Sequence, residues 1–389
     1  MSSLPGRTVV KHVTSSARAK RAGPVRRVLI YRLGSLGDTI VALPALRLIA
    51  QAFPDAERLM LTNFNINAKA APVSQVLAGT QLIHGCIEYP IGVRNLSKLM
   101  QLRSRIRELR PDVLVYLTES RNLPKTLRDA LFFRACGIRR LIGVPYTADM
   151  RTCRNKGDGM YESEGARLAR CVHELGEMRP DDQAAFDLKL SSAEREAARL
   201  ALESLKPGKP LFAVSIGAKV DVKDWGDTNW SALLSRLSDH FAGWGLVMLG
   251  VEMERERSDA LLKYWQGASL NLCGRLSVHE SAAVLERCRL FLGHDSGPMH
   301  LAAAVGTRCV AIFSSRNLPG EWFPYGSGHR VLYRSMPCQG CRREVCVDLQ
   351  KACIRSITAD EVLDAIVTVL DTKLYMQTAP TILHLVQRQ

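Results

Sequence analysis

The sequence has no run of about 18 uncharged apolar residues, the length that a membrane-spanning helix requires, so such a helix is excluded. Aromatic residues make up only 6%, and no aromatic-rich basic motif, helix-turn-helix or zinc-finger pattern is present. A protein that binds nucleic acid is therefore disfavoured. Hydrophobic residues at 47% and charged residues at 23% are ordinary for a globular chain, and 389 residues suggest two or three domains.

Acidic residues are in short supply. The chain has 53 Lys and Arg residues against 38 Asp and Glu, a net charge of +15, which favours anionic partners such as phosphorylated small molecules or a membrane face. Residues 1–25 form a basic tail, interpreted as a solvated extension or as a contact with the membrane surface. No apolar stretch typical of a secretory signal follows it, and most of the 11 cysteines are single in apolar contexts. We therefore expect reduced thiols and a cytoplasmic location.

Short apolar strands alternate with amphipathic helices, a pattern that predicts parallel α/β units. The alternation stops at the proline-rich segment 206–210 and then restarts. We predict two Rossmann-like domains facing a central cleft, with the ligand at the carboxyl ends of the strands. The expected boundaries are a tail at 1–25, an N-terminal domain at 26–205, a C-terminal domain at 206–375 and a tail at 376–389.

The first candidate site lies between the first strand and the first helix. Gly34, Ser35 and Gly37 form a turn in which the glycines let the backbone approach a ligand, and the helix N-terminus can bind an anion. Asp38 follows in the first helical turn. It has two interpretations, a helix N-cap or a general base facing the cleft.

Two further candidates lie in the second half. Gly217 ends a strand and Lys223 follows before a helix, which suggests a lysine on a diphosphate or, alternatively, a surface lysine. Asp295, Ser296 and Gly297 stand between a strand and a helix, where backbone N–H groups can bind an anion. The alternative is a capped helix start, and a lone histidine such as His300 is more often structural than catalytic.

Two sets of residues have less specific patterns. Glu254 could accept hydrogen bonds from a ribose or an amino group, or it could be a solvated acid at a helix start. Cys338, Cys341, Cys346 and Cys353 fall within 16 residues and could hold a structural zinc or iron ion. Reduced thiols and disulfides remain the alternatives for these cysteines.

Several of these segments together form a family signature. It comprises the Arg32–Leu46 stretch RLGSLGDTIVALPAL, Phe53–Ala56, Lys223–Trp225, and the Asp295–Ala304 stretch DSGPMHLAAA. With these motifs the chain resembles glycosyltransferase family 9, the ADP-heptose:lipopolysaccharide heptosyltransferases, from about residue 26 to about residue 370. The resemblance implies a GT-B fold with the acceptor in the N-terminal domain and the nucleotide-sugar in the C-terminal domain. It also implies inversion at the anomeric carbon and no required cofactor.

The resemblance also implies roles for individual residues. Asp38 is expected to be the base that deprotonates the acceptor hydroxyl, and the Gly34, Ser35 and Gly37 turn is expected to contact phosphate or acceptor. The residues expected to bind the donor are Gly217, Lys223, Glu254, Asp295, Ser296, Gly297 and His300.

The expected function is therefore inverting transfer of a heptose from ADP-heptose to a lipopolysaccharide-core or related glycan acceptor. The basic composition suits a lipid-linked acceptor on the cytoplasmic face of the inner membrane. One alternative is a glycosyltransferase that uses another nucleotide-sugar. A second is a GT-B-fold nucleotide-sugar epimerase, which would need a second acid or base in the cleft, and no motif points to such a residue.

Overall fold

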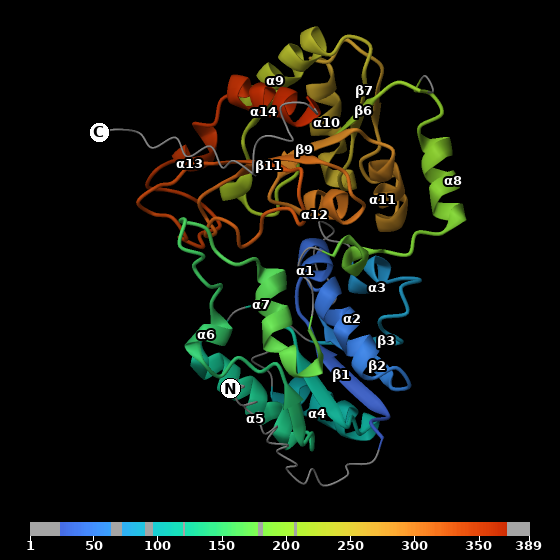
Figure 1. The fold of residues 1–389 in the computed structure, drawn as a ribbon, viewed down its shortest axis with the longest axis vertical. Helices are drawn as coiled ribbons and strands as arrows, with labels where there is room; N and C mark the ends of the chain where they lie inside the picture. Colours follow the sequence, from blue (N-terminus) through green and yellow to red (C-terminus); the bar gives the residue numbers. More distant parts are fainter. Residues whose placement is uncertain are drawn as a thin grey trace, which may run out of the picture.

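The computed structural model describes residues 24–63, 72–89, 96–119, 121–177, 182–205 and 208–371. The chain forms two α/β halves stacked along the long axis of the molecule (Figure 1). Nearly all of the predicted tail 1–25 and all of the tail 376–389 lie outside the described residues. Within the described ranges, no helix combines the length and the apolar character needed to cross a membrane.

The first half is built on a five-stranded parallel sheet with the strand order β3-β2-β1-β4-β5. Its strands are β1 (Arg27–Tyr31), β2 (Glu57–Thr62), β3 (Gly85–Glu88), β4 (Val113–Tyr116) and β5 (Arg140–Ile142). Its helices are α1 (Leu36–Val41), α2 (Leu43–Ala52), α3 (Val73–Val76), α4 (Leu96–Leu109), α5 (Leu123–Ala135), α6 (Ala148–Arg151) and α7 (Glu164–Cys171).

The second half holds a six-stranded parallel sheet in the order β11-β10-β9-β6-β7-β8, which is the doubly wound arrangement of a dinucleotide-binding fold. Its strands are β6 (Leu211–Ser215), β7 (Gly245–Met248), β8 (Ser269–Asn271), β9 (Leu290–His294), β10 (Cys309–Phe313) and β11 (Arg330–Tyr333). Its α-helices are α9 (Asp227–His240), α10 (Arg255–Leu262), α11 (Val278–Glu286), α12 (Gly297–Ala304), α13 (Ala352–Arg355) and α14 (Ala359–Leu370). The 3₁₀ turns are η1 (His173–Leu175), η2 (Gln183–Phe186), η3 (Asp221–Lys223) and η4 (Glu252–Glu254).

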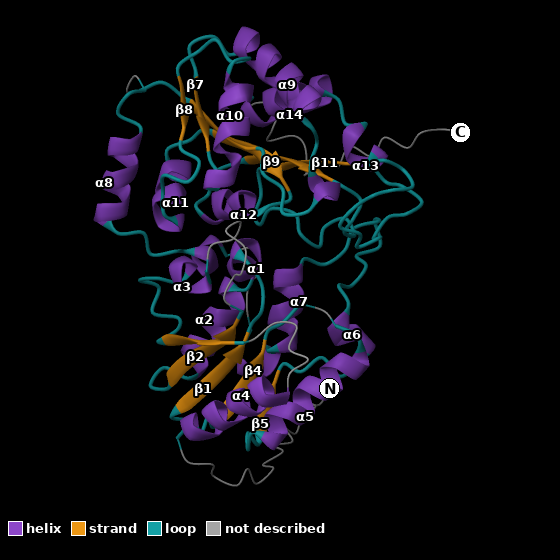
Figure 2. Cartoon of the chain, turned by 180° about the vertical axis from the view of Figure 1, so that it is seen from behind, coloured by secondary structure: helices purple, strands orange, loops and turns teal. Residues whose placement is uncertain are grey.

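The apolar core joins the two halves. One buried cluster runs from the first sheet through α1 and α2 to α11, α12 and the second sheet. A second cluster lies under α4 and α5 on the other face of the first sheet, and a third lies beneath α9 and α14 in the second half. Figure 2 shows both sheets with their carboxyl ends directed toward the region between the halves. The predicted architecture of two Rossmann-like halves is confirmed.

The packing of α8 (Ser192–Ala201) differs from the expected domain boundary at residue 206. This helix lies against α11 of the second half, and Arg195 on α8 forms an ion pair with Glu286 on α11 at 3.0 Å. The chain therefore reaches the second half before the proline-rich segment that the composition singles out. The structure describes only part of that segment, since residues 206–207 fall outside the described ranges.

Candidate active site

The turn between β1 and α1 holds the first predicted group. Thr39 donates its backbone N–H to the carbonyl of Ser35 at 3.0 Å, which makes Ser35 the N-cap of α1. The Oδ2 atom of Asp38 accepts hydrogen bonds from the N–H of Ser35 at 2.7 Å and from its hydroxyl at 2.9 Å. The interpretation of Asp38 as the N-cap is therefore wrong. Asp38 is the third residue of the helix, and its side chain accepts hydrogen bonds from the N-cap residue, as in a capping box. Gly34 has a φ of +149°, and a β-carbon there would collide with the side chain of Asp38.

A buried arginine fixes the position of this turn. Arg32 is fully buried and donates one N–H to the carbonyl of Leu117 at 2.6 Å, just beyond β4. It donates another to the carbonyl of Asp38, and the same nitrogen lies 3.9 Å from Oδ1 of that residue. Oδ2 of Asp38 is thus held by Ser35, while Oδ1 faces a cation at longer range. This arrangement leaves Oδ1 able to accept a hydrogen bond from an incoming hydroxyl.

Helices α1 and α12 meet at their N-terminal turns, one from each half. A β-carbon built on Gly37 would stand 2.8 Å from Cδ2 of His300, and one built on Gly297 would stand 2.8 Å from Cδ2 of Leu36. Both separations are shorter than real β-carbon contacts, so a larger residue at either position would require His300 or Leu36 to shift. The two helix N-termini therefore lie in direct contact, and they bring Asp38 of the first half beside the Asp295–Gly297 segment of the second.

Lys223 and Asp295 form a charged pair at the edge of this contact. The Nζ atom of Lys223, in η3, lies 2.7 Å from Oδ2 of Asp295, which also accepts a hydrogen bond from Asn317 at 3.0 Å. Arg342 donates to Oδ1 of Asn317 at 2.9 Å and pairs with the buried Glu321 at 2.7 Å. A continuous polar chain therefore runs from the lysine predicted to hold phosphate to a second cation, Arg342.

Two buried polar atoms in α12 have no hydrogen-bond partner among the described residues. They are the hydroxyl of Ser296, the N-cap of α12, and Nε2 of His300. Burial lowers the pKa of His300 to about 4, against the opposing effect of Asp295 and with a small contribution from Lys223. His300 is therefore neutral at pH 7. A buried polar atom without a hydrogen-bond partner destabilises the folded state. Two such atoms close together are therefore typical of a site where a bound ligand supplies the missing partners.

A cavity of about 360 Å³ lies between the two halves beside this contact. Its walls include Ser35 from the first half and Gly217, Ser296 and Gly297 from the second. The carboxylate of Glu254 lies so close to Gly217 and Gly250 that a β-carbon on either would collide with it. The other wall of the cavity is apolar and is formed by Leu249, Val251, Leu276, Val278, Leu285 and Leu301. The structure thus gathers the predicted donor residues around one cavity and the α1–α12 contact.

Glu119 is not among the residues that the motifs predict, yet it stands at the same edge of the first sheet. It lies three residues beyond β4, the neighbour of β1, and solvent reaches its side chain. Surrounding protein nevertheless removes part of its hydration, and this burial raises the pKa of its carboxyl, with further contributions from Asp38 and Glu164. An acidic residue three positions after a central strand is a weak sequence signal, because the environment that raises its pKa comes from other segments.

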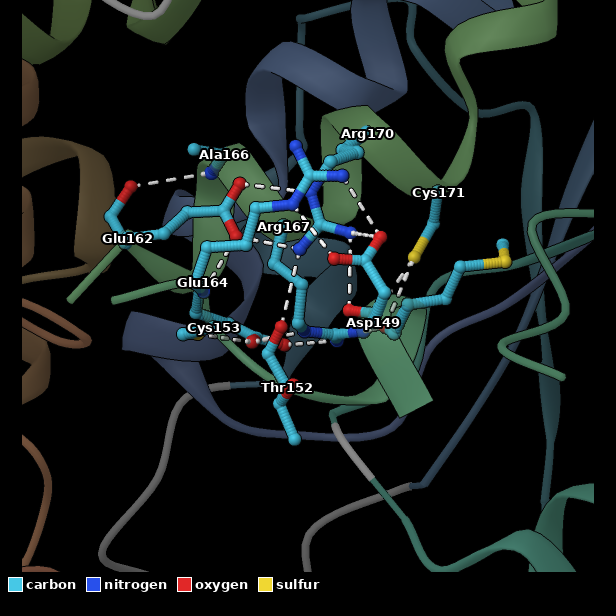
Figure 3. A network of polar contacts seen from close by, with 12 residues as sticks. Asp149, Thr152, Cys153, Glu162, Glu164, Ala166, Arg167, Arg170 and Cys171 are labelled. Carbon is cyan, nitrogen blue, oxygen red and sulfur yellow. Dashed lines mark hydrogen bonds and ion pairs between the residues drawn. The ribbon is translucent and has the colours of Figure 1, made fainter. Parts of the chain in front are cut away.

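A network of ion pairs and hydrogen bonds surrounds the start of α7 (Figure 3). Buried Arg167 on α7 pairs with Glu164 at 2.6 Å and donates to the carbonyl of Thr118 at 3.0 Å. Nearby, Arg170 pairs with Glu162 at 2.6 Å and with Asp149 at 3.0 Å. The network therefore fixes both the residue before Glu119 and the start of α7.

The segment before α7 reaches across to the second half. Residues 154–162 form a hairpin, in which the Glu162 N–H donates to the carbonyl of Arg154 at 2.7 Å. The N–H of Tyr161 donates to the carbonyl of Pro319 at 2.8 Å, and the N–H of Glu164 donates to the carbonyl of Glu321 at 2.9 Å. We call residues 154–164 the cross-cleft hairpin, since it links the two halves at a second place besides α1 and α12.

His294 and the four clustered cysteines do not line the cavity. His294 is fully buried; its Nε2 accepts a hydrogen bond from the Trp225 N–H at 3.2 Å, and burial lowers its pKa to about 4. The four clustered cysteines range from exposed Cys338 to buried Cys353, and all are free thiols. Among the described residues no three His, Cys, Asp or Glu side chains converge as metal ligands would. The possibility that these four thiols hold a metal ion therefore finds no support among the described residues.

Comparison with known proteins agrees with this arrangement. The family model "Glycosyltransferase family 9 (heptosyltransferase)" matches residues 122–352, more than half of the chain. A curated relative, lipopolysaccharide heptosyltransferase 1 of Pseudomonas aeruginosa, is 25% identical over 82% of this chain and 87% of its own. A solved family 9 glycosyltransferase from Veillonella parvula superposes with a TM-score of 0.67 at 19% identity, covering 91% of this chain and 99% of that one. The E. coli heptosyltransferase WaaC with ADP-2-deoxy-2-fluoro heptose gives a TM-score of 0.55 at 18% identity, covering 87% and 98%.

Proposed function

The chain belongs to glycosyltransferase family 9, and from this membership we propose that it transfers a heptose from ADP-heptose to a hydroxyl of a lipopolysaccharide-core or related glycan acceptor, with inversion. One observation carries the proposal: the N-terminal turns of α1 and α12 are in contact, so the Asp38 carboxylate, held by Ser35, and the start of α12 lie beside the cavity that Ser35 and Ser296 line. Transfer from a nucleotide-sugar needs both groups at one place.

Asp38 is proposed as the general base. Its Oδ2 is held by two hydrogen bonds from Ser35, and its backbone carbonyl is held by buried Arg32, so the carboxylate is fixed before substrate arrives. Its Oδ1 then accepts the proton of the acceptor hydroxyl as that oxygen attacks the anomeric carbon. A fixed orientation supports catalysis because little reorganisation is needed at the moment of reaction.

The departing diphosphate is proposed to bind at the start of α12 and at Lys223. The N–H groups at the helix start and the free hydroxyl of Ser296 can donate to phosphate oxygens, and Lys223 supplies a positive charge. The charge that develops on the leaving group is then stabilised by these donors. We propose that transfer needs no added metal, and an unchanged rate in the presence of EDTA would support this.

The nucleotide is proposed to occupy the cavity. Its apolar wall, including Val251, Leu276 and Val278, suits a flat nucleobase, and the carboxylate of Glu254 can accept hydrogen bonds from a ribose or an amino group. The sequence left open a donor with another nucleotide. Calorimetry with ADP, UDP and GDP addresses this directly: binding of ADP at least tenfold tighter than the other two supports the proposal, and tighter binding of UDP or GDP contradicts it.

The epimerase alternative calls for a second acidic group, and Glu119 stands near Asp38. Family membership nevertheless favours transfer, and the two reactions differ in their need for an acceptor. Transfer releases ADP from ADP-heptose only when an acceptor, such as lipopolysaccharide lacking core heptose, is added. An epimerase alters the sugar without any acceptor, so a product of that kind would exclude our proposal.

Replacement of Asp38 by Asn tests the base assignment. We expect Asp38→Asn to lower the transfer rate by about 10²–10⁴-fold, while the affinity for ADP stays unchanged. Asp227→Asn, an exposed acid in the first turn of α9, is the matched control and should leave both quantities unchanged. If Asp38→Asn transfers heptose at the wild-type rate, Asp38 is not the base.

We further propose that the enzyme works in the cytoplasm, on the face of the inner membrane where a lipid-linked acceptor is available. All 11 cysteines are free thiols, which fits a reducing compartment. Fractionation of cells that express the chain at its native level tests the location. Recovery in the periplasmic fraction would contradict it.

A further inference from the structure

Helices α4 and α5 present apolar side chains to solvent on the outer side of the first half. Six of them are exposed, with Leu96 at 71% and Leu131 at 69% accessible: Leu96, Leu99, Met100, Leu123, Leu127 and Leu131. Eight basic side chains on the same two helices and in the turns that follow them are also exposed: Lys98, Arg105, Arg107, Arg110, Lys125, Arg128, Arg134 and Arg139. We call these fourteen residues the α4–α5 face.

The apolar side chains are ordered along each helix. On α4, Leu96, Leu99 and Met100 occupy positions i, i+3 and i+4, and on α5, Leu123, Leu127 and Leu131 follow every fourth residue. Residues with these spacings lie on one side of a helix. Each helix therefore carries an apolar stripe in addition to the buried one, formed on α4 by Leu102 and Ile106, with which it covers the sheet.

The two helices lie side by side, as both overall views show (Figures 1 and 2). Arg103 on α4 donates to the carbonyl of Ala135 at the end of α5 at 3.1 Å, and both helices cover the same apolar cluster. The stripes thus belong to one surface rather than to two separate sites. Contiguous exposed apolar side chains of this kind mark an interaction surface.

The charge around the stripes identifies the kind of partner. Within residues 96–110 and 121–139, there are eight exposed basic side chains and one exposed acid, Glu108, since Asp129 is buried and paired with Arg121 and Arg128. A surface that combines apolar side chains with a surplus of cations matches an anionic lipid bilayer, in which the cations meet headgroups and the apolar groups enter the interface. We propose that the α4–α5 face docks on the surface of an anionic phospholipid bilayer.

Two other occupants fit these side chains less well. A second copy of the chain would bring eight like charges against eight, which opposes association at moderate salt. A nucleic acid would pair with the cations but would leave six exposed apolar side chains without contacts, and none of them is an aromatic residue that could stack on a base. The bilayer satisfies both features at once.

The face also lies at the appropriate end of the domain. Leu123 starts α5 only four residues after Glu119, and four residues span at most about 14 Å. The apolar start of α5 is therefore near the carboxyl edge of the first sheet, where Asp38 and Glu119 stand. The inference rests on the proposed function and deepens it. A docked enzyme would hold its acceptor half against the lipid layer that contains a lipid-linked acceptor.

Sedimentation of the purified full chain with vesicles tests the proposal. We expect binding to vesicles of phosphatidylglycerol and phosphatidylethanolamine and little binding to vesicles of phosphatidylcholine. Arg105→Gln with Arg107→Gln should weaken binding to the anionic vesicles on the order of tenfold, since each interfacial cation contributes about fivefold. The matched control, Lys263→Gln with Arg275→Gln, changes exposed cations of the second half and should bind as the wild type does.

A second variant isolates the apolar stripes. Replacement of Leu96, Met100, Leu127 and Leu131 by Ser should reduce vesicle binding at least tenfold, whereas Leu200→Ser with Tyr264→Ser, at exposed sites elsewhere, should not. Equal binding of the stripe variant and the wild type, or no binding of the wild type to anionic vesicles, would overturn the proposal. The proposal would also be overturned if the wild type did not bind vesicles but formed dimers in sedimentation velocity, and the stripe variant did not form these dimers.

The readout is independent of the chemistry. Vesicle binding needs neither donor nor acceptor, so its failure would leave the proposed transfer reaction untouched. ADP affinity measured by calorimetry on the same variants should be unchanged, because the substituted side chains lie outside the cavity. Retained ADP affinity also shows that the variants are folded, which keeps a loss of vesicle binding interpretable.

Discussion

The ammonium group of Lys223 lies 2.7 Å from the carboxylate of Asp295, and both side chains are largely shielded from solvent. In this arrangement the cation proposed to hold the donor diphosphate already has an anionic partner. An incoming phosphate must therefore share Lys223 with Asp295 or replace that carboxylate. The pair holds the lysine side chain in one position before the nucleotide binds.

Lys223→Ala is expected to weaken ADP binding by about tenfold or more, since hydrogen bonds between charged groups contribute about 1.5–3 kcal/mol. Lys223→Arg, which keeps the charge, should lose less affinity. Calorimetry with ADP measures the effect, and Lys263→Ala at an exposed position is the control. Equal affinity of Lys223→Ala and the wild type would remove the phosphate role.

Gly37→Ala tests the contact between the two halves. Alanine favours a helix over glycine by about 1 kcal/mol, but its β-carbon would stand 2.8 Å from His300, and such overpacking costs about 1–3 kcal/mol. We expect a transfer rate at least tenfold lower and a smaller increase in melting temperature on addition of ADP. His300→Ala removes the clashing ring, so without ADP the double variant should melt at the temperature of His300→Ala alone if the clash is the cause. A Gly37→Ala enzyme with wild-type behaviour would show that the halves separate freely.

Glu119→Gln tests the carboxyl that the motifs do not predict. Burial and the neighbouring acids raise the pKa of Glu119, so its ionised form is disfavoured in the folded protein. A raised pKa stabilises the fold below the ordinary titration range and loses this contribution as pH rises through the folded value. Glu119→Gln should therefore melt higher than the wild type at pH 7 but not at pH 4. The exposed Glu203→Gln should show no such difference.

The same variant should affect the reaction without affecting the donor. Because Glu119 lies near Asp38, the proposed base, we expect Glu119→Gln to transfer more slowly at an unchanged ADP affinity. A melting temperature that responds equally at both pH values would contradict the assigned environment of this carboxyl. Unchanged kinetics would show that Glu119 has no part in acceptor binding.

His294 gives the stability of the fold a predictable pH dependence. Burial lowers its pKa to about 4, while the unfolded chain binds a proton near pH 6.5. The unfolded state therefore holds more protons between these values, and stability falls as pH drops from 6.5 toward 4. Over the range from 6.5 to 5 this residue contributes about 2 kcal/mol. Thermal melts of His294→Gln should lose this part of the slope, whereas the exposed His240→Gln should keep the wild-type slope.

The central strands could be predicted from sequence because each is a short apolar run next to a turn and a periodic helix. Strands β1, β4, β6 and β9 are of this kind, and they position Asp38 and Asp295. The outer strands β3, β5, β8 and β11 have three or four residues and mixed polarity, so their apolar patterns are too short to detect. These outer strands form through backbone hydrogen bonds to the neighbouring strand.

The candidate site was predictable only where a glycine-rich turn marks it. The contact of Gly37 with His300 joins residues 263 positions apart, and no local pattern encodes such a pairing. Glu119 was missed for the same reason, since its environment comes from Asp38 and Glu164 on other segments. The cysteines were ambiguous in sequence, because their close spacing fits a metal site and reduced thiols alike, and among the described residues no metal-ligand group forms.

The cross-cleft hairpin has a consequence for the timing of the reaction. The amides of Tyr161 and Glu164 donate to carbonyls of the opposite half, so any swing that admits a bulky glycan along this side must first break two backbone bonds. Hydrogen exchange of these two amides therefore reports on separation of the halves. In deuterated water both should exchange whenever the halves separate, and their exchange rates should fall once a bound nucleotide holds the halves together.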